Sequence, residues 1–282
     1  MRVALFDSSL FYESLGLTNL MGVLKAHNYE YKLFIISEEK NILSSMKEFR
    51  PDLLCFTTCT GIHHVSFRVA RYIKSKINIP TLFGGPHVTV FPDECIKEDC
   101  VDMLCRGEGE DALLELLHAL ENKNDYTQIK NLWVKKNGLI FKNDIRPLVQ
   151  DLDTIPLPDR SQYLKHSVLM ALPFKRFITG YGCPFKCSFC YNGQIQNIFK
   201  DSGNKYLRYK DPENLIREIS NTCEGRRVES IFFVDDLFSA NKKWLAHFLD
   251  IYKKEIAHPF MCTTRANLMT EDVAKMLSEA GC

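Results

Sequence analysis

Short apolar runs alternate with amphipathic segments over about the first 120 residues of the chain. Runs rich in Val, Ile, Leu and Phe predict buried strands, and segments whose apolar residues recur every three or four positions predict helices. Strands that alternate with helices indicate a doubly wound parallel sheet. The expected strands span residues 3–6, 31–36, 53–57, 81–83 and 103–105, and the expected helices span 17–26, 42–49, 65–76, 91–97 and 111–120.

Small and polar residues follow most of the expected strands. Ligands of such sheets bind beyond the carboxyl ends of the strands, where glycines let backbone amides approach a bulky group. Taken one loop at a time, these residues are better explained as turns and helix caps. Several such loops at one edge favour a flat or phosphate-bearing ligand. The residues are Gly16, Thr57-Thr58, Gly84-Gly85-Pro86-His87 and Gly107-Glu108-Gly109-Glu110.

Residues 126–173 read as a connection between two domains. Asn137-Gly138 stands between two β-rich runs, which predicts a hairpin. Pro147, Pro156 and Pro158 follow among acidic residues. Proline favours extended structure in itself and in the residue before it, so we interpret this stretch as a linker.

A second series of strands and helices begins at about residue 174. The expected strands are 176–181, 230–234 and 260–263, and the expected helices are 212–223, 242–254 and 271–280. Successive βα units predict the start of a β/α barrel, whose chemistry lies at the carboxyl ends of the strands. Three units cannot close a barrel, so we expect a piece of a longer chain or completion by another polypeptide.

Composition narrows the classes of protein. The 282 residues are 45% hydrophobic and 25% charged, as in globular proteins. Lys plus Arg number 36 and Asp plus Glu 35, so no net field favours nucleic acid or an anionic membrane. The chain shows neither an apolar run of membrane-span length nor a signal peptide. We therefore expect a cytoplasmic protein that binds neither nucleic acid nor membrane.

Eleven cysteines favour metal binding or buried thiols over disulfides in such a chain. Cys183, Cys187 and Cys190 lie within eight positions, separated by three and then two residues. Thiolates select iron–sulfur clusters, zinc or copper(I), and three protein ligands leave one metal corner open. The alternatives are a zinc site completed by Cys223 or His166, and unrelated buried thiols. We interpret the other cysteines as core residues: Cys55, Cys59, Cys95, Cys100, Cys105, Cys223, Cys262 and Cys282.

The loop Tyr181-Gly182-Cys183-Pro184-Phe185-Lys186-Cys187-Ser188-Phe189-Cys190 resembles the cluster loop of radical S-adenosylmethionine (SAM) enzymes. In that family the three cysteines hold a [4Fe–4S] cluster, and the amino and carboxylate groups of SAM chelate the fourth iron. The resemblance therefore implies that Cys183, Cys187 and Cys190 are cluster ligands.

The domain before this loop resembles the cobalamin-binding domain of cobalamin-dependent radical SAM enzymes. The chain lacks the D-x-H-x-x-G motif by which other cobalamin proteins supply a histidine to cobalt. That absence is usual in the radical SAM branch, and it leaves open a bound cobalamin or a domain that has lost it. The resemblance assigns to cobalamin the residues Gly16, Thr57, Thr58, Gly84, Gly85, Pro86, Gly107 and Glu108.

The resemblance also divides the chain. We expect a cobalamin-binding-like domain at 1–125, a hairpin and proline-rich linker at 126–173, and an incomplete radical SAM domain at 174–282. The linker motif Leu152-Asp153-Thr154-Ile155-Pro156-Leu157-Pro158 is similar to the connection in the family. Ala280-Gly281-Cys282 is similar to the segment that leads into the next strand, which favours truncation within the barrel.

Four residues are candidates for contact with SAM. Asp235 and Asp236 end the second barrel strand, where a carboxylate can accept hydrogen bonds from an amine, although Asp pairs are also common in turns. The resemblance assigns the SAM amino group to this pair, and successive side chains point apart, so we expect one of them to bind it. Arg265 is a candidate for the SAM carboxylate or for an ion pair. Phe189 is expected near adenine or as an anchor in the core.

The resemblance implies reductive cleavage of SAM to a 5′-deoxyadenosyl radical and, with cobalamin, methyl transfer to an unactivated carbon or phosphorus. The substrate would be a small molecule or peptide, and the electron would come from a donor such as flavodoxin or ferredoxin. The alternatives are a cobalamin-dependent radical cyclase or oxidoreductase, and a non-catalytic iron–sulfur or zinc module. No catalytic residue is assigned, because the family draws its substrate contacts largely from later strands.

Overall fold

The chain folds into two compact units, each with its own apolar core. The computed structural model describes residues 1–8, 12–166 and 172–282. The first unit contains Met1–Leu148 and the segment that begins at Pro156. The second contains Val149–Ile155 and the chain from residue 172 onward. The connecting stretch is thus shared between the two units.

The first unit is built on a seven-stranded sheet with the order β2-β1-β3-β4-β5-β6-β7. The pairings among β1 to β5 are parallel, which confirms the predicted doubly wound sheet. The strands are β1 (Arg2–Asp7), β2 (Glu30–Ile35), β3 (Leu53–Thr57), β4 (Thr81–Gly84), β5 (Met103–Cys105), β6 (Leu132–Lys136) and β7 (Leu139–Lys142).

Aromatic side chains pack across this sheet in one row. Phe6 is paired in register with Phe34 on one side and with Phe56 on the other, and Phe56 is paired with Phe83. Their rings stack at centroid distances of 5.3, 4.3 and 4.8 Å. All four are buried. Such stacking adds to the free energy gained by burying the rings, and it ties four adjacent strands together.

The helices of the first unit agree with the expected positions except between β4 and β5. One helix was expected over 91–97, but Pro86 begins one short helix and Pro92 begins another. Proline fits the first turn of a helix and ends a preceding one, so it divides this segment. The helices are α1 (Leu15–Ala26), α2 (Ile42–Phe49), α3 (His63–Lys74), α4 (Pro86–Val90), α5 (Pro92–Cys95) and α6 (Glu110–Glu121).

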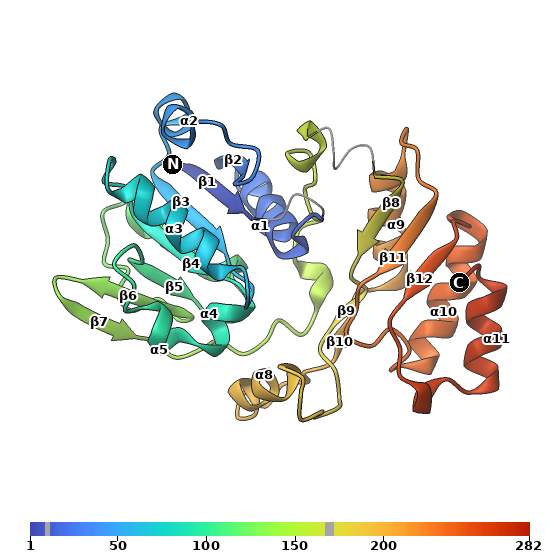
Figure 1. Cartoon of the computed structure of the whole chain (residues 1–282). Helices are drawn as coiled ribbons and strands as arrows, with labels where there is room; N and C mark the ends of the chain where they lie inside the picture. The colour runs from blue at the N-terminus through green and yellow to red at the C-terminus, as the bar shows by residue number, and fades with distance from the viewer. Residues whose placement is uncertain (9–11, 167–171) are drawn as a thin grey trace. The chain divides into compact units, whose positions relative to one another are not determined.

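The predicted hairpin forms and extends the sheet. Asn137 and Gly138 have φ values of 53° and 77°, the left-handed conformations of a tight hairpin turn. β6 pairs antiparallel with both β7 and β5. The hairpin therefore belongs to the first unit rather than to a free connection (Figure 1).

The segment that begins at Pro156 packs against α1 and the end of β1. A Cβ added at Gly22 would lie 2.3 Å from the carbonyl oxygen of Leu157, so only glycine allows this approach. Asp159 donates its backbone N–H to Thr18 O, and the buried Tyr163 hydroxyl donates to Asp7 at 2.6 Å. These contacts attach half of the predicted linker to the first unit.

The second unit contains three parallel strands in the order β12-β11-β8, with helices packed against the sheet. This confirms the predicted βα units. The expected strand at 176–181 is divided into β8 and β9, and β9 pairs antiparallel with β10. The elements are β8 (Phe174–Phe177), β9 (Gly180–Tyr181), α8 (Asn192–Phe199), β10 (Arg208–Tyr209), α9 (Pro212–Cys223), β11 (Ser230–Phe233), α10 (Lys242–Glu255), β12 (Phe260–Cys262) and α11 (Glu271–Glu279).

The core of the second unit lies between the strands and the helices α9, α10 and α11. Phe233 on β11 contacts Phe248 and Tyr252 of α10 edge to face at 5.5 and 5.8 Å, and it stacks on Phe238 at 4.9 Å. Asp211 caps α9, accepting from the backbone N–H groups of Glu213 and Asn214. The sheet and its helices thus hold the carboxyl ends of β8 and β11 in place.

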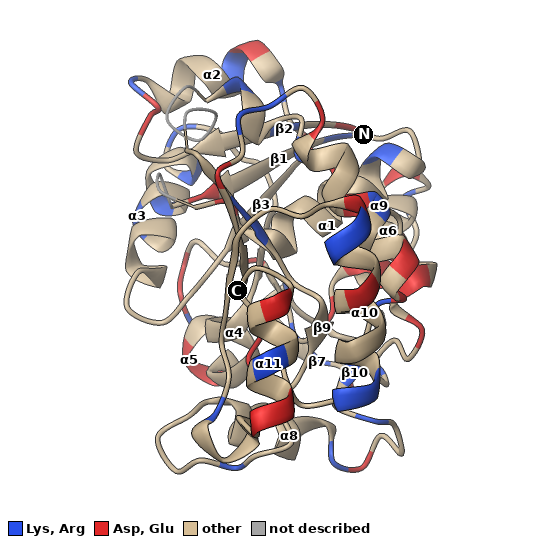
Figure 2. Cartoon of the chain, turned by 90° about the vertical axis from the view of Figure 1, so that its right-hand side faces the viewer, with Lys and Arg blue, Asp and Glu red and all other residues tan. Residues whose placement is uncertain are grey.

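The distribution of charged residues on the elements agrees with the nearly equal numbers of basic and acidic residues in the sequence. Figure 2 shows basic and acidic residues interspersed over the elements rather than separated by sign. Among the described residues, none of the helices combines the length and apolar character that a membrane crossing requires.

Candidate functional site

The three cysteines lie on the loop that follows β9. Cys183 is buried, whereas Cys187 and Cys190 are partly exposed. Gly182 precedes the loop at a φ of 94°, and a Cβ there would lie 2.4 Å from the carbonyl oxygen of Tyr206. This glycine is therefore needed both for its backbone conformation and for the close approach of the segment that leads into β10.

Each of the three sulfur atoms has an N–H group directed at it. Burial raises the pKa of Cys183, and the backbone N–H of Phe185 opposes that rise. Arg265 Nη1 donates to Cys187 Sγ at 3.5 Å, and Asn192 Nδ2 donates to Cys190 Sγ at 3.7 Å. Groups that donate to sulfur stabilise thiolates, which are the form that binds metal.

The helix α8, immediately after the loop, supplies residues that the sequence analysis missed. Gln196 donates its side-chain amide to Cys183 O at 2.5 Å and to Phe185 O at 3.1 Å. Asn192 accepts a hydrogen bond from the Tyr206 hydroxyl at 2.7 Å. These residues could have been found from the sequence, because Asn192 and Gln196 are amide side chains that closely follow the last cysteine.

The adjacent residues Asp235 and Asp236 differ in their surroundings. Asp235 is only 4% exposed and accepts from the Thr179 backbone N–H at 3.1 Å, the Thr179 hydroxyl at 2.6 Å and the Gly180 N–H at 2.8 Å. Burial raises the pKa of Asp235 to about 6, against the lowering effect of these donors. Asp236 is exposed. Asp235 thus holds the β8–β9 junction, and Asp236 presents its carboxylate outward.

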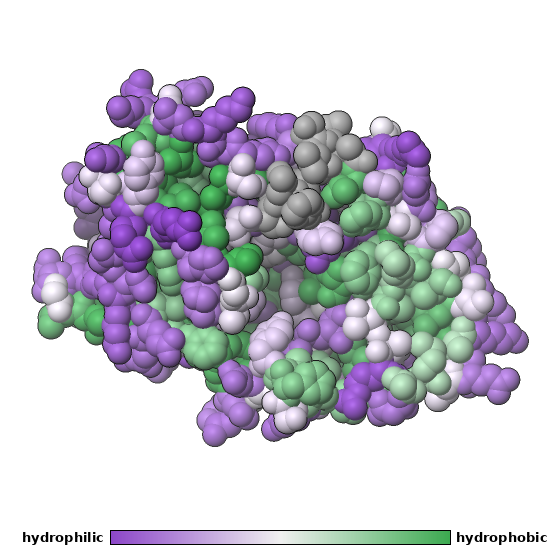
Figure 3. All heavy atoms as spheres, viewed as in Figure 1, coloured by the Kyte–Doolittle hydropathy of each residue, from purple (hydrophilic) through white to green (hydrophobic). Residues whose placement is uncertain are grey.

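Two aromatic residues of the loop lie differently from one another. Phe185 packs under the Arg265 guanidinium, whose central carbon is 3.8 Å from the ring centroid. Phe189 is 93% exposed, so it does not anchor the loop in the core. Figure 3 shows apolar atoms exposed on the second unit, and Phe189 is among its exposed large apolar residues.

The three thiols do not converge as the ligands of a single ion would. Tetrahedral zinc at a Zn–S distance of about 2.3 Å brings its sulfurs to roughly 3.8 Å from one another. Among the described residues, the group whose ligand atoms lie within 4.8 Å of one another is Glu98, Asp99 and Cys100, and not the loop cysteines. Three thiolates on one loop are also the donor set of a cluster, in which each thiolate binds a different iron.

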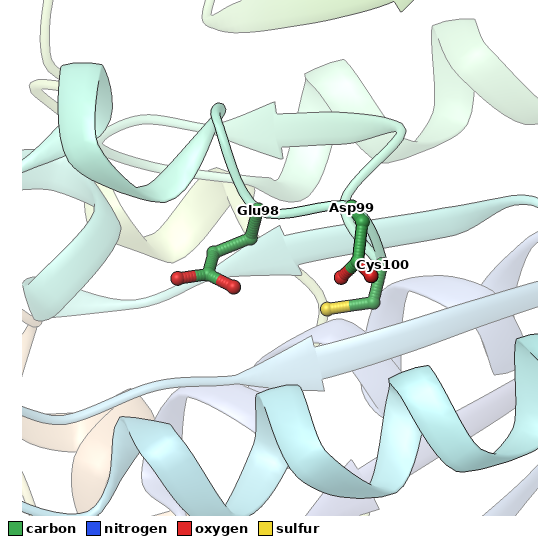
Figure 4. Close-up of side chains that lie close together, drawn as sticks. All are labelled: Glu98, Asp99 and Cys100. Atoms are coloured by element: carbon green, nitrogen blue, oxygen red, sulfur yellow. The ribbon is translucent and has the colours of Figure 1, made fainter.

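Glu98, Asp99 and Cys100 lie together on the turn before β5 (Figure 4). Arg71 donates to Glu98 at 2.6 Å and to Asp99 at 2.8 Å, so both carboxylates are already paired with a cation. Burial raises the pKa of Cys100 to about 11, so its thiol remains protonated near neutral pH. This turn is therefore an ion-paired surface feature rather than a metal site.

At the predicted ligand-binding edge of the first unit, the loops after β3 and β4 contact each other through hydrogen bonds and close packing. Thr58 donates its backbone N–H and its hydroxyl to Gly84 O, at 2.9 and 2.8 Å. Gly85 has a φ of 102°, and a Cβ there would lie 2.6 Å from Thr58 O. Pro86 begins α4 directly afterwards. Thr58 and Gly85 thus fix the β3 and β4 loops against each other.

The remaining edge residues lie in the neighbouring loops. Gly107, at a φ of 75°, donates its N–H to the Thr89 hydroxyl, and Glu108 O accepts from Asn131. Gly16 lies in the first turn of α1, and in the described part of the chain, apart from its chain neighbours and its own helix backbone, no atom lies within 4 Å of where its Cβ would be. Thr57 ends β3. The order β2-β1-β3 makes the carboxyl ends of β1 and β3 the switch point at which such sheets bind ligands.

A histidine pair that the sequence analysis did not assign lies at this edge. The rings of His63 and His87 stack at 3.6 Å with 15° between their planes, and the Thr60 hydroxyl is 3.1 Å from His87 Nδ1. Burial and the neighbouring His63 lower the pKa of His87. Both effects favour the neutral form of the His87 ring.

Two families of known proteins match separate parts of this chain. Residues 1–117 match the B12 binding domain family, and residues 177–282 match the radical SAM superfamily. An uncharacterized methyltransferase of Pyrococcus horikoshii is 32% identical over 86% of this chain and 52% of its own length. The cobalamin-dependent radical SAM methyltransferase TokK of Streptomyces tokunonensis is 26% identical over 84% of this chain and 35% of its own.

Solved structures share the fold. The radical SAM methyltransferase TsrM from Kitasatospora setae superposes with a TM-score of 0.78 at 14% identity, over all of this chain and 58% of that one. The cobalamin-dependent radical SAM enzyme OxsB gives 0.78 at 15% identity, over 99% and 41%. The chain belongs to the radical SAM proteins that carry an N-terminal B12 binding domain. It spans about half the length of the Pyrococcus relative.

Proposed function

We propose that the protein is a cobalamin-dependent radical SAM methyltransferase that acts on an unactivated carbon or phosphorus. The observation that carries this proposal is the cysteine loop, with three thiols on one loop, each faced by an N–H donor. Its relatives named as methyltransferases support the reaction class. Flavodoxin or ferredoxin is the proposed class of electron donor, and a small molecule or peptide the proposed substrate.

Cys183, Cys187 and Cys190 would hold a [4Fe–4S] cluster. When bound and reduced, such a cluster supplies the electron that cleaves SAM and yields the radical that starts the reaction. The chain's share is to hold the three thiolates, to leave one corner open and to position SAM. Gly182 and Gln196 fix the backbone of the loop for this role.

The chain offers separate groups to the parts of SAM. Asp236 is exposed at the carboxyl end of β11, so we assign the amino group to Asp236 rather than to the buried Asp235. Arg265 uses one N–H on Cys187, and its other donors match the SAM carboxylate. The exposed ring of Phe189 offers a stacking surface for adenine.

For cobalamin we propose the edge at Gly16, Thr57, Thr58, Gly84, Gly85, Pro86, Gly107 and Glu108, within the segment that matches the B12 binding domain. The sharp turns at Gly85 and Gly107 suit the close approach of a large planar ring. We propose that cobalt receives no histidine from this chain, because the sequence lacks the motif that supplies one.

A radical cyclase is the second candidate. The anaerobic magnesium-protoporphyrin IX monomethyl ester cyclase of Cereibacter sphaeroides is 26% identical over 82% of this chain and 38% of its own length. A methyltransferase consumes SAM also as a methyl donor and forms S-adenosylhomocysteine, whereas a cyclase forms none. Product analysis on the whole protein therefore separates the two.

The test is anaerobic reconstitution with iron and sulfide. We expect about four irons per chain, from the cluster type, and an EPR signal of the reduced protein that changes when SAM is added. Alanine in place of Cys183, Cys187 or Cys190 should abolish both, whereas Cys223→Ala, outside the loop, should retain them. A protein that binds only zinc, or a cluster that ignores SAM, would contradict the proposal.

A further inference from the structure

One side chain donates to a loop sulfur from a buried position. Asn192, the first residue of α8, is 3% exposed, and its Nδ2 lies 3.7 Å from Cys190 Sγ. Because this amide is buried, water competes little with it for the sulfur, and the low local dielectric strengthens the hydrogen bond. The contact therefore bears on the electronic properties of whatever Cys190 ligates.

Tyr206 determines which end of the amide faces the sulfur. The oxygen and nitrogen of an asparagine amide are nearly equal in shape, so the hydrogen-bond network decides their orientation. The Tyr206 hydroxyl donates to Asn192 Oδ1 at 2.7 Å, which leaves the NH2 group to face Cys190. Burial raises the pKa of Tyr206, so its hydroxyl keeps its proton and remains a donor at ordinary pH.

Tyr206 is itself held by the backbone of the cysteine loop. Its carbonyl oxygen and ring pack so closely on Gly182 that a Cβ there would lie 2.4 Å from the oxygen and 3.0 Å from the ring. The chain Gly182–Tyr206–Asn192–Cys190 is thus continuous through packing and hydrogen bonds. It reaches the sulfur from outside the three-cysteine motif.

A hydrogen bond donated to a ligand sulfur shifts the reduction potential of a cluster in a predictable direction. Reduction adds one negative charge to an iron–sulfur cluster, and the charge is spread onto the thiolate sulfurs. An N–H dipole directed at such a sulfur stabilises the reduced form more than the oxidised form. Hydrogen bonds to the sulfurs are accordingly among the factors that set cluster potentials.

We propose that Asn192, oriented by Tyr206, is a positioning residue that raises the reduction potential of the cluster through its hydrogen bond to Cys190. This inference rests on the proposed function, because it requires that the loop bind a cluster. Asn192 and Tyr206 would thus affect the reduction of the cluster, a step that precedes the cleavage of SAM. Because this contact makes the cluster easier to reduce, a wider range of electron donors can reduce it.

The test is an EPR-monitored redox titration of the reconstituted protein without SAM. Asn192→Leu keeps the branched arrangement of side-chain heavy atoms and removes the donor, and Tyr206→Phe keeps the amide but frees its orientation. Asn197→Leu, on the exposed part of the same helix, is the matched control.

At the potential where the wild type is half reduced, we expect the ratio of reduced to oxidised cluster to fall about tenfold in Asn192→Leu. That ratio corresponds to about 59 mV for a one-electron couple. Tyr206→Phe should shift the ratio in the same direction by less, and Asn197→Leu should leave it unchanged. A merely structural role for Asn192 would alter cluster content or stability but not this ratio.

The outcomes separate this inference from the function on which it rests. A wild type that forms no SAM-responsive cluster overturns the proposed function. A wild type with such a cluster, and variants that keep its midpoint at equal iron content, overturns the inference alone. If Asn192→Leu assembles no cluster, Tyr206→Phe decides: a lowered midpoint supports the inference and an unchanged one overturns it.

Discussion

At the scale of single residues, the structure separates side chains that are equivalent in the sequence. Asp235 and Asp236 are adjacent and chemically identical, yet one accepts hydrogen bonds from Thr179 and Gly180 and the other is exposed. Because successive residues at a strand end point in opposite directions, one carboxylate is buried and the other reaches the surface. The structure therefore gives Asp235 a structural role and leaves the Asp236 carboxylate exposed.

Substitution of the two aspartates should have unequal effects on stability. Asp235→Asn replaces one acceptor oxygen with an NH2 group that faces the donors of Thr179 and Gly180, so we expect a loss of about 2 to 4 kcal/mol in the free energy of unfolding. Asp236→Asn should change it by less than about 0.5 kcal/mol and should instead weaken the EPR response to SAM. Urea denaturation measures the first effect, and equal stabilities of the two variants would contradict the assignment.

The pH dependence of this effect has a predictable sign. The pKa of Asp235 in the folded chain, about 6, lies above its ordinary value of 3.8, so the folded state binds this proton more tightly than the unfolded state. The resulting stabilisation is full below pH 3.8 and is lost as pH rises through 6. The stability advantage of the wild type over Asp235→Asn should therefore decrease by on the order of 2 to 3 kcal/mol between pH 4 and pH 7. An advantage that grows with pH would be the opposite of this expectation.

At the scale of elements, the loops after the strands are ordered by close backbone contacts. Thr58 and Gly85 join the β3 and β4 loops, and Gly182 brings the cysteine loop against Tyr206. In both places a glycine occurs where the backbone is left-handed and another backbone group occupies the space of a Cβ. Glycine at these positions serves the contact between loops, whatever ligand binds beside them.

Two glycines of the first unit provide a matched comparison. Gly61 and Gly85 have φ values of 95° and 102°, but of the two only Gly85 is crowded, because a Cβ added there would lie 2.6 Å from Thr58 O. Gly61→Ala should cost about 1 to 2 kcal/mol from backbone strain alone. Gly85→Ala should cost on the order of 3 kcal/mol or more, because the β3 and β4 loops must separate. Urea denaturation with equal losses for both would show that the contact with Thr58 is unimportant.

At the scale of the whole molecule, the chain contains two separate apolar cores. One includes Phe6, Phe34 and Phe56 from the first unit, and the other includes Phe233 and Phe248 from the second. Units with their own cores commonly unfold independently. The two cofactor-binding regions therefore depend on different cores.

Calorimetry should resolve two unfolding transitions. Phe34→Ala should lower the transition of the first unit by roughly 10 °C and Phe248→Ala that of the second by a similar amount, because each leaves a cavity in one core. Added cobalamin should raise only the transition that Phe34→Ala lowers, since a ligand stabilises the folded state that binds it. A single transition that responds to both substitutions would contradict independent cores.

Much of the fold was predictable because its signals are local. Apolar runs and helical periodicity located β1 to β5, α1, α2, α3 and α6, and Asn137-Gly138 located the hairpin. The pairing of β6 with β5 was not predictable, because the hairpin signal says nothing about which strand edge it joins. The short helix α4 before the helix expected at 91–97 was missed, because Pro86 fits a turn as well as a helix start.

The sequence by itself determined the chemical class of the site, since three closely spaced cysteines restrict the ligand to a soft metal centre. Only the tertiary structure decided which side chains surround those sulfurs. Tyr206 and Arg265 reach the loop and its helix through folding contacts, and Arg265 is separated from Cys187 by 78 positions in the chain. Spacing along a chain encodes groups that act within one loop, whereas hydrogen bonds between distant segments depend on strand order and packing, which no local pattern records.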